Sequence, residues 1–155
     1  MKEHEVEAIE IKELATEFRN AIESLLKNQI PCEMKDFPLG ACGDASLLLG
    51  AYLSDQGILG FKYATGKRKK PKSSAEDHHG WLIREGLVVD ITADQFADAP
   101  AGVIVEHNSS WHQKFKPDLP PSDGDFRNRL CSATAYLAPT YSNILSALPR
   151  QPGKQ

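Results

Sequence analysis

The sequence is poor in the features that mark secreted or membrane-bound proteins. Its 155 residues include three cysteines, Cys32, Cys42 and Cys131. So small and odd a number argues against a disulfide framework and for a reducing compartment. No apolar run approaches the roughly 20 residues that a membrane helix needs, and the acidic start lacks the apolar segment of a secretory signal. We therefore expect a cytoplasmic protein that makes no contact with a membrane.

Strong charge of one sign and metal-binding motifs are also missing. The net charge of −3 implies no bulk attraction to nucleic acid. The basic run Lys67 to Lys72 could contact an acidic partner, but no aromatic residues interleave it, so a solvated surface loop is favoured. The chain has no Cys-x-x-Cys or His-Glu-x-x-His spacing. We therefore expect no metal and no cofactor.

The composition present suits one domain with a real core. Hydrophobic residues make up 41% of the chain, and a chain of this length can bury a core of its own. We place the domain at residues 1–149 and a frayed tail at 150–155. Apolar periodicity predicts two peripheral helices, and apolar runs predict two further strands. The helices are expected at Glu5 to Lys27 and Pro139 to Leu148, and the strands at Ile58 to Thr65 and Val103 to Glu106.

The most informative helix is the one predicted from Cys42 to Gln56. Its leucines and alanines make it apolar nearly all round, which is typical of a buried central helix. A thiol at a helix start lies beside unpaired N–H groups and the positive end of the helix dipole, and both favour the thiolate. The N–H groups of Cys42 and Gly43 could also bind an oxyanion. Taken alone, Cys42 could equally be a small buried apolar side chain.

A hairpin downstream supplies the partners of such a thiol. His79 to Arg84 and Leu87 to Thr92 are apolar-rich runs joined by Glu85-Gly86, a plausible two-residue turn. With that turn, His79, Trp81 and Asp90 project from one face, and His79 and Asp90 form a diagonal pair within side-chain reach. The same alternation places His78 on the opposite face of the hairpin, away from Asp90.

Two further segments are candidate parts of the site. Gln95, in the turn after the second strand, is a candidate side-chain donor, although capping of a surface turn is favoured. The segment His107 to His112 is a candidate lining of a cleft, but an edge loop with Trp111 in the core is favoured.

The order of these parts resembles that of the papain-like cysteine enzymes of the transglutaminase-like superfamily. The resemblance lies in a Cys that begins a buried helix, the run His79-Gly80-Trp81-Leu82 and the run Val89-Asp90-Ile91-Thr92. The spacings, 79 − 42 = 37 and 90 − 79 = 11, are also similar to those of arylamine N-acetyltransferases. The resemblance covers Phe37 to Phe96. It implies an α+β, papain-like/transglutaminase-like fold in which a central Cys-bearing helix packs on an antiparallel sheet carrying the His and the Asp.

The resemblance also implies a Cys-His-Asp triad, in which Cys42 is the nucleophile, His79 the general base and acid, and Asp90 the residue that orients His79. We expect acyl transfer on amide bonds through a thioester, most readily hydrolysis of the protease or glutamine deamidase type, with amine transfer as the second outcome. The substrate would be a protein, a peptide or another amide, and Gly43, Trp81 and Gln95 would lie near the reacting atoms. The alternative is a non-catalytic interaction module that keeps the fold and binds through the basic run and the Trp111 region.

Overall fold

The computed structural model describes residues 2–129 and 134–149, and this part of the chain is a mixed α+β structure. Its three α-helices are α1 (Lys2–Ser24), α2 (Cys42–Asp55) and α3 (Leu137–Ala147). Its strands are β1 (Lys62–Lys69), β2 (Glu76–Arg84), β3 (Leu87–Asp90), β4 (Ile104–His107), β5 (Lys116–Pro117) and β6 (Ser122–Asp123).

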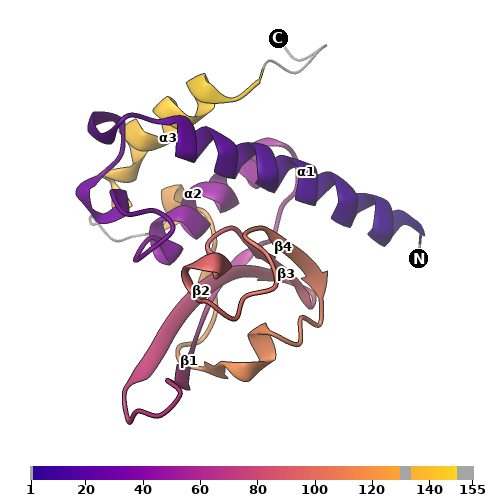
Figure 1. The fold of residues 1–155 in the computed structure, drawn as a ribbon. Helices are drawn as coiled ribbons and strands as arrows, with labels where there is room; N and C mark the ends of the chain where they lie inside the picture. The colour runs from indigo at the N-terminus through magenta and orange to yellow at the C-terminus, as the bar shows by residue number, and fades with distance from the viewer. Residues whose placement is uncertain (1, 130–133, 150–155) are drawn as a thin grey trace.

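The strands form one antiparallel sheet, and the helices gather on one side of it (Figure 1). The strand order is β4-β3-β2-β1-β5, with β6 pairing with β1. Helix α2 packs against β2, and its apolar side chains join those of α1 and α3 in the larger core. The other face of the sheet carries a second, aromatic core, made of Ala64, Trp81, Val88, Ala93, Ile104, Trp111 and Phe115. The sheet is therefore covered on both faces.

Helix α2 is buried along most of its length, as its composition predicts. Every residue from Ala45 to Leu53 is buried. Gly50 faces backbone: a Cβ placed there would overlap the carbonyl oxygen of Gly124. A glycine at this position lets the helix approach the segment after β6 closely, since any side chain would push the two apart.

The β2–β3 hairpin has the predicted turn and register. Leu82 pairs with Val89, Ile83 with Val88 and Arg84 with Leu87. The turn residues Glu85 and Gly86 have φ angles of 48° and 81°. Positive φ at both central residues is the signature of the tight hairpin turn that fixes this register.

Several predicted boundaries were wrong. The strand expected at Ile58 to Thr65 runs instead from Lys62 to Lys69, so half of the basic run belongs to a strand. The reason is tertiary: β1 pairs with β2 along its whole length, and the Arg68 guanidinium lies over the Phe115 ring, 4.6 Å from its centre. Helix α1 begins earlier and ends before Lys27, which starts a separate 3-10 turn. Cys131 and the tail expected at 150–155 lie outside the described residues.

No described helix combines the length and the apolar character needed to cross a membrane.

Candidate active site

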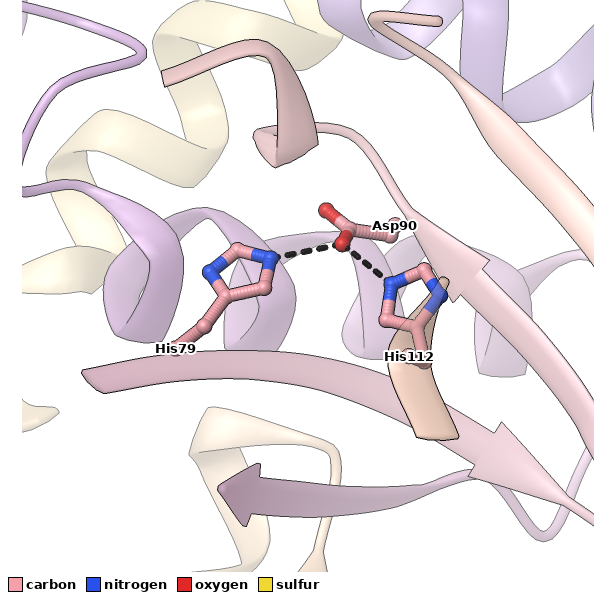
Figure 2. A group of neighbouring side chains, drawn as sticks. All are labelled: His79, Asp90 and His112. Carbon is pink, nitrogen blue, oxygen red and sulfur yellow. Dashed lines mark hydrogen bonds and ion pairs between the residues drawn. The ribbon is translucent and has the colours of Figure 1, made fainter. Parts of the chain in front are cut away.

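A buried carboxylate lies at the centre of the site. One oxygen of Asp90, Oδ2, is 2.6 Å from His79 Nε2 and 2.7 Å from His112 Nε2. Figure 2 shows the two imidazole rings on either side of this oxygen. His79 projects from β2, Asp90 ends β3, and His112 begins the 3-10 turn His112–Lys114. All three side chains are almost wholly buried.

The second oxygen of Asp90 is also occupied. Oδ1 accepts a hydrogen bond from the backbone N–H of Thr92 at 2.9 Å and lies 3.4 Å from the Thr92 hydroxyl. Burial acts to raise the pKa of Asp90, but the hydrogen bonds from His112 and His79 outweigh it and hold the pKa far below its usual range. Asp90 is therefore a fixed anion whose acceptor sites are all in use.

His79 is enclosed by aromatic rings and bound to that anion. Burial acts to lower the pKa of His79, but the hydrogen bond and charge of Asp90, together with the interaction with Cys42, raise it to about 9. His79 is then an imidazolium at neutral pH, balanced by Asp90. Nε2 faces Asp90, and Nδ1 lies 3.3 Å from the side-chain nitrogen of Gln95. Four rings lie with their centres within 6 Å of the His79 ring: Trp81, Phe96, Trp111 and Phe115.

Cys42 is the first residue of α2 and is half-buried. The N-cap residue, Ala41, offers no capping side chain. The first N–H groups of a helix have no acceptor within it, so the backbone donors around Cys42 stay available to a bound anion. Cys42 acts on both His79 and Tyr63 and is one of the causes that raise the pKa of each.

The phenol of Tyr63, in β1, packs on Gly80, a residue of the neighbouring strand β2. Tyr63 in β1 pairs with Leu82, so Gly80 is its diagonal neighbour on the same face of β2. A Cβ placed on Gly80 would overlap Tyr63 Oη, and one placed on Gly43 would lie 3.3 Å from it. The absence of a side chain at Gly80 thus allows the phenol to reach the start of α2.

This contact makes Gly80→Ala a sharp test of the packing. We expect the new methyl group to displace the Tyr63 ring and to lower the free energy of unfolding by about 1–3 kcal/mol, the usual cost of an overpacked site. Urea unfolding of the single variants and of the Tyr63→Ala, Gly80→Ala double variant measures the coupling. When Tyr63 is already alanine, Gly80→Ala should change the free energy of unfolding very little. An equal loss of stability with and without the Tyr63 ring would contradict the contact.

The other residues named from the sequence lie as follows. Gln95 does both things that the sequence allowed: its Nε2 caps the turn by donating to the Thr92 carbonyl at 3.1 Å, and the same nitrogen lies 3.3 Å from His79 Nδ1. Thr92, at the N-cap of that turn, makes no side-chain cap. Trp81 is buried beside His79, as expected from the shared face. His78 points away, with 64% of its side chain exposed.

Three residues of the site were missed from the sequence. His112 was assigned to an edge loop, yet it is buried on Asp90, while the prediction that Trp111 enters the core is confirmed. Ser109 Oγ lies 2.6 Å from His112 Nδ1 and was not considered. Tyr63 was expected only as a strand residue. The one sequence signal was Ser109-x-x-His112, a spacing that allows a serine to bond a histidine at the start of a turn.

Asp90, His79 and His112 also form a group that could hold a metal ion, with ligand atoms within 4.8 Å of one another. Metal ligands of these types bind at about 2.0–2.2 Å. Here both imidazole nitrogens instead lie at hydrogen-bonding distance from a single carboxylate oxygen, which is typical of charge-assisted hydrogen bonds. A metal would have to replace both protons and move at least one ring.

The protonation of His79 predicts a loss of stability at alkaline pH. Its folded pKa of about 9 lies above the ordinary 6.5. The contribution of His79 is therefore complete below about pH 6.5 and is lost as the pH rises through about 9. At about 1.4 kcal/mol per pKa unit, the free energy of unfolding should fall by roughly 3 kcal/mol across this range. The pKa of Asp90 is lowered on folding, so its contribution to stability has the opposite pH dependence. That contribution is lost only as the pH falls well into the acid range.

Urea unfolding over a pH series, for the protein and for His79→Gln, measures this difference. The difference in the free energy of unfolding between the two proteins should be largest at and below about pH 6.5 and should shrink toward about pH 10. A difference in the free energy of unfolding that does not change with pH would show that His79 is neutral in the folded chain.

Comparison with known proteins returned no match to any family model, any curated protein or any solved structure.

Proposed function

We propose that this chain is a thiol enzyme that transfers acyl groups from amide substrates through a thioester on Cys42. The observation that supports the proposal most strongly is the arrangement around His79. One nitrogen of its ring is 2.6 Å from a buried carboxylate, and the side chain interacts with a thiol at the start of a helix. A nucleophile, a base and a residue that orients the base are the three parts of a catalytic triad.

The reaction would begin from a thiolate–imidazolium pair. The Cys42 thiolate attacks the carbonyl carbon of the substrate, and an electron pair of the C=O bond moves onto the oxygen. When the carbonyl re-forms, the C–N bond breaks, and the His79 imidazolium gives its proton to the departing amine. A water molecule, deprotonated by His79, then attacks the thioester, and the S–C bond breaks to release the acid and regenerate the thiolate. With an amine in place of water, the product is a new amide.

Asp90 would keep the ring of His79 in place through these proton transfers. His112 and Thr92 hold the carboxylate from the other sides, so it cannot turn away from His79. Ser109 bonds the remaining nitrogen of His112 and so favours the tautomer that donates to Asp90. We infer that His112 and Ser109 are positioning residues that act through Asp90.

The donors for the substrate oxygen would come from the start of α2 and from Gln95. The backbone N–H groups of Cys42 and Gly43 are unsatisfied within the helix. The Gln95 amide donates one N–H to the Thr92 carbonyl, which fixes its orientation. Its second N–H cannot bond the protonated Nδ1 of the neighbouring His79 imidazolium and is left for the substrate oxygen. Preorganised donors of this kind stabilise the charge that develops on the carbonyl oxygen.

The papain-like fold is part of the same proposal. A helix that begins with the thiol, β2 carrying His79 and β3 carrying Asp90 follow one another in the order that the resemblance implies. The antiparallel sheet with α2 packed on β2 is in keeping with that fold. Peptide bonds and glutamine side chains are the substrates that we favour, with hydrolysis ahead of amine transfer.

The reactivity of Cys42 tests the proposal without a known substrate. We expect Cys42 to react fastest of the three cysteines with iodoacetamide. The physical reason is the imidazolium of His79 beside the sulfur. Peptide mapping after alkylation over a pH series measures each cysteine separately, with the exposed Cys32 as the internal reference.

The variant His79→Ala is the matched control, because it removes the imidazolium beside the sulfur and should slow the alkylation of Cys42. A Cys42 that is inert in the folded protein, or that reacts alike with and without His79, would contradict the proposal. The non-catalytic interaction module would then be the better interpretation.

A further inference from the structure

We infer that Tyr63 is a further catalytic residue, whose phenol donates a hydrogen bond to the oxyanion that forms when Cys42 attacks a carbonyl. This inference rests on the function proposed above and adds a side chain that neither the triad nor the helix N–H groups include. The argument depends on where the phenol lies, on what holds it there and on its protonation state.

The phenol lies where donors for an oxyanion are needed. Tyr63 Oη would be 3.3 Å from a Cβ on Gly43, whose N–H is one of the free donors at the start of α2. It also interacts with Cys42 itself. The phenol and the Gly43 backbone thus border the same space beside the sulfur, and an oxygen attached to the attacked carbon would enter that space.

Packing holds the ring in this position. The missing side chain of Gly80 gives room for Oη, as the overlap with an added Cβ shows. The Arg129 guanidinium lies 6.0 Å from the centre of the Tyr63 ring, and its Nη1 donates to Ser122 Oγ at 2.7 Å and to the Asp123 carbonyl at 3.0 Å. β6, which carries these two acceptors, pairs with β1 next to Tyr63. The phenol is therefore placed by two strands and needs little rearrangement before it can donate.

The proton stays on Tyr63 in the range where the enzyme would work. Burial, the nearby Cys42 and the Asp44 carboxylate all raise the pKa of Tyr63 well above its ordinary value. A neutral phenol beside a thiolate donates its O–H and does not compete as a second anion. As the negative charge moves from sulfur to the carbonyl oxygen, the same O–H can follow it, which is the condition for selective stabilisation of the transition state.

Two electrophiles separate this role from a general effect on the thiol. Acylation by p-nitrophenyl acetate forms the S–C bond through a tetrahedral oxyanion and then expels p-nitrophenolate. Alkylation by iodoacetamide displaces iodide at a saturated carbon and forms no oxyanion. Loss of one oxyanion donor costs roughly 10²–10³-fold in rate, so Tyr63→Phe should lower acylation of Cys42 by about that factor. Its alkylation rate at the same pH should stay close to that of the unmodified protein.

Tyr141→Phe is the matched control, since it removes a phenol that bonds Asp55 at 2.5 Å, outside the proposed site. Both rates should be unchanged in that variant. Equal acylation by Tyr63→Phe and the unmodified protein would overturn the inference and leave the proposed function standing. A parallel loss of both rates in Tyr63→Phe would overturn it too, because Tyr63 would then act on the thiol or on the fold. An unmodified protein whose Cys42 reacts with neither electrophile would overturn both.

Discussion

Replacing Cys42 with alanine is expected to abolish turnover and all acylation by p-nitrophenyl acetate, while the protein stays folded. The sulfur is the only group of the proposed site that can carry the acyl intermediate, so no other residue can take its place. The change removes one sulfur from a half-buried position at a helix start. Such a change should lower the free energy of unfolding by on the order of 1 kcal/mol.

Intact-mass analysis after exposure to the ester measures this directly. The unmodified protein should gain one acetyl group, and peptide mapping should place it on Cys42. Cys32→Ala is the control, because this thiol is exposed and lies before the start of α2; it should leave the acylation unchanged. Turnover of any amide substrate by Cys42→Ala would refute the assignment of the nucleophile.

Replacing Asp90 with asparagine is expected to have a large effect on both activity and stability. The amide has nearly the same shape, but it carries no charge and offers an N–H₂ group where two imidazole N–H groups now donate. His79 would lose the anion that keeps it protonated. Breaking a buried ion pair by removing one partner costs about 3–5 kcal/mol, and loss of the orienting acid of a triad costs roughly four orders of magnitude in rate.

Urea unfolding and the rate of Cys42 alkylation at mildly acidic pH measure the two effects separately. Asp118→Asn is the matched control, because Asp118 lies 3.8 Å from the exposed histidine, His78, in a pair that solvent screens. His78→Ala should be equally mild. A reactive Cys42 in His79→Ala together with an unreactive one in His78→Ala would show that the alternation along β2 has been assigned one residue out of step.

Two elements of the site follow from the sequence because their causes are local. The apolar composition after Cys42 sets a buried helix that begins at the thiol, and α2 does begin there. The Glu85-Gly86 turn fixes the hairpin register, and a period of two then places His79 and Asp90 on one face. Both inferences need only chain geometry over a few residues, and both agree with the structure.

The remaining parts of the site depend on contacts between distant segments. His112 is 22 residues from Asp90, and its segment has no periodicity that would aim its ring at the sheet. Gln95 caps its turn, as the sequence favours, but the sequence of a short turn does not show that the same amide lies beside His79. The end of β1 was misplaced for a similar reason: its basic residues favour solvent by composition, while pairing with β2 draws them into the sheet.

The sequence by itself determined the order and the faces of the parts: a thiol at a helix start, then a histidine and an acid paired across a tight turn. Only the tertiary structure decided which side chains surround them. It brought His112 and Ser109 behind the acid, and it laid the phenol of Tyr63 over Gly80 beside the thiol. The physical reason is that periodicity and turn chemistry are set by neighbours along the chain, whereas the filling of a buried space is set by whichever side chains the packed elements bring together.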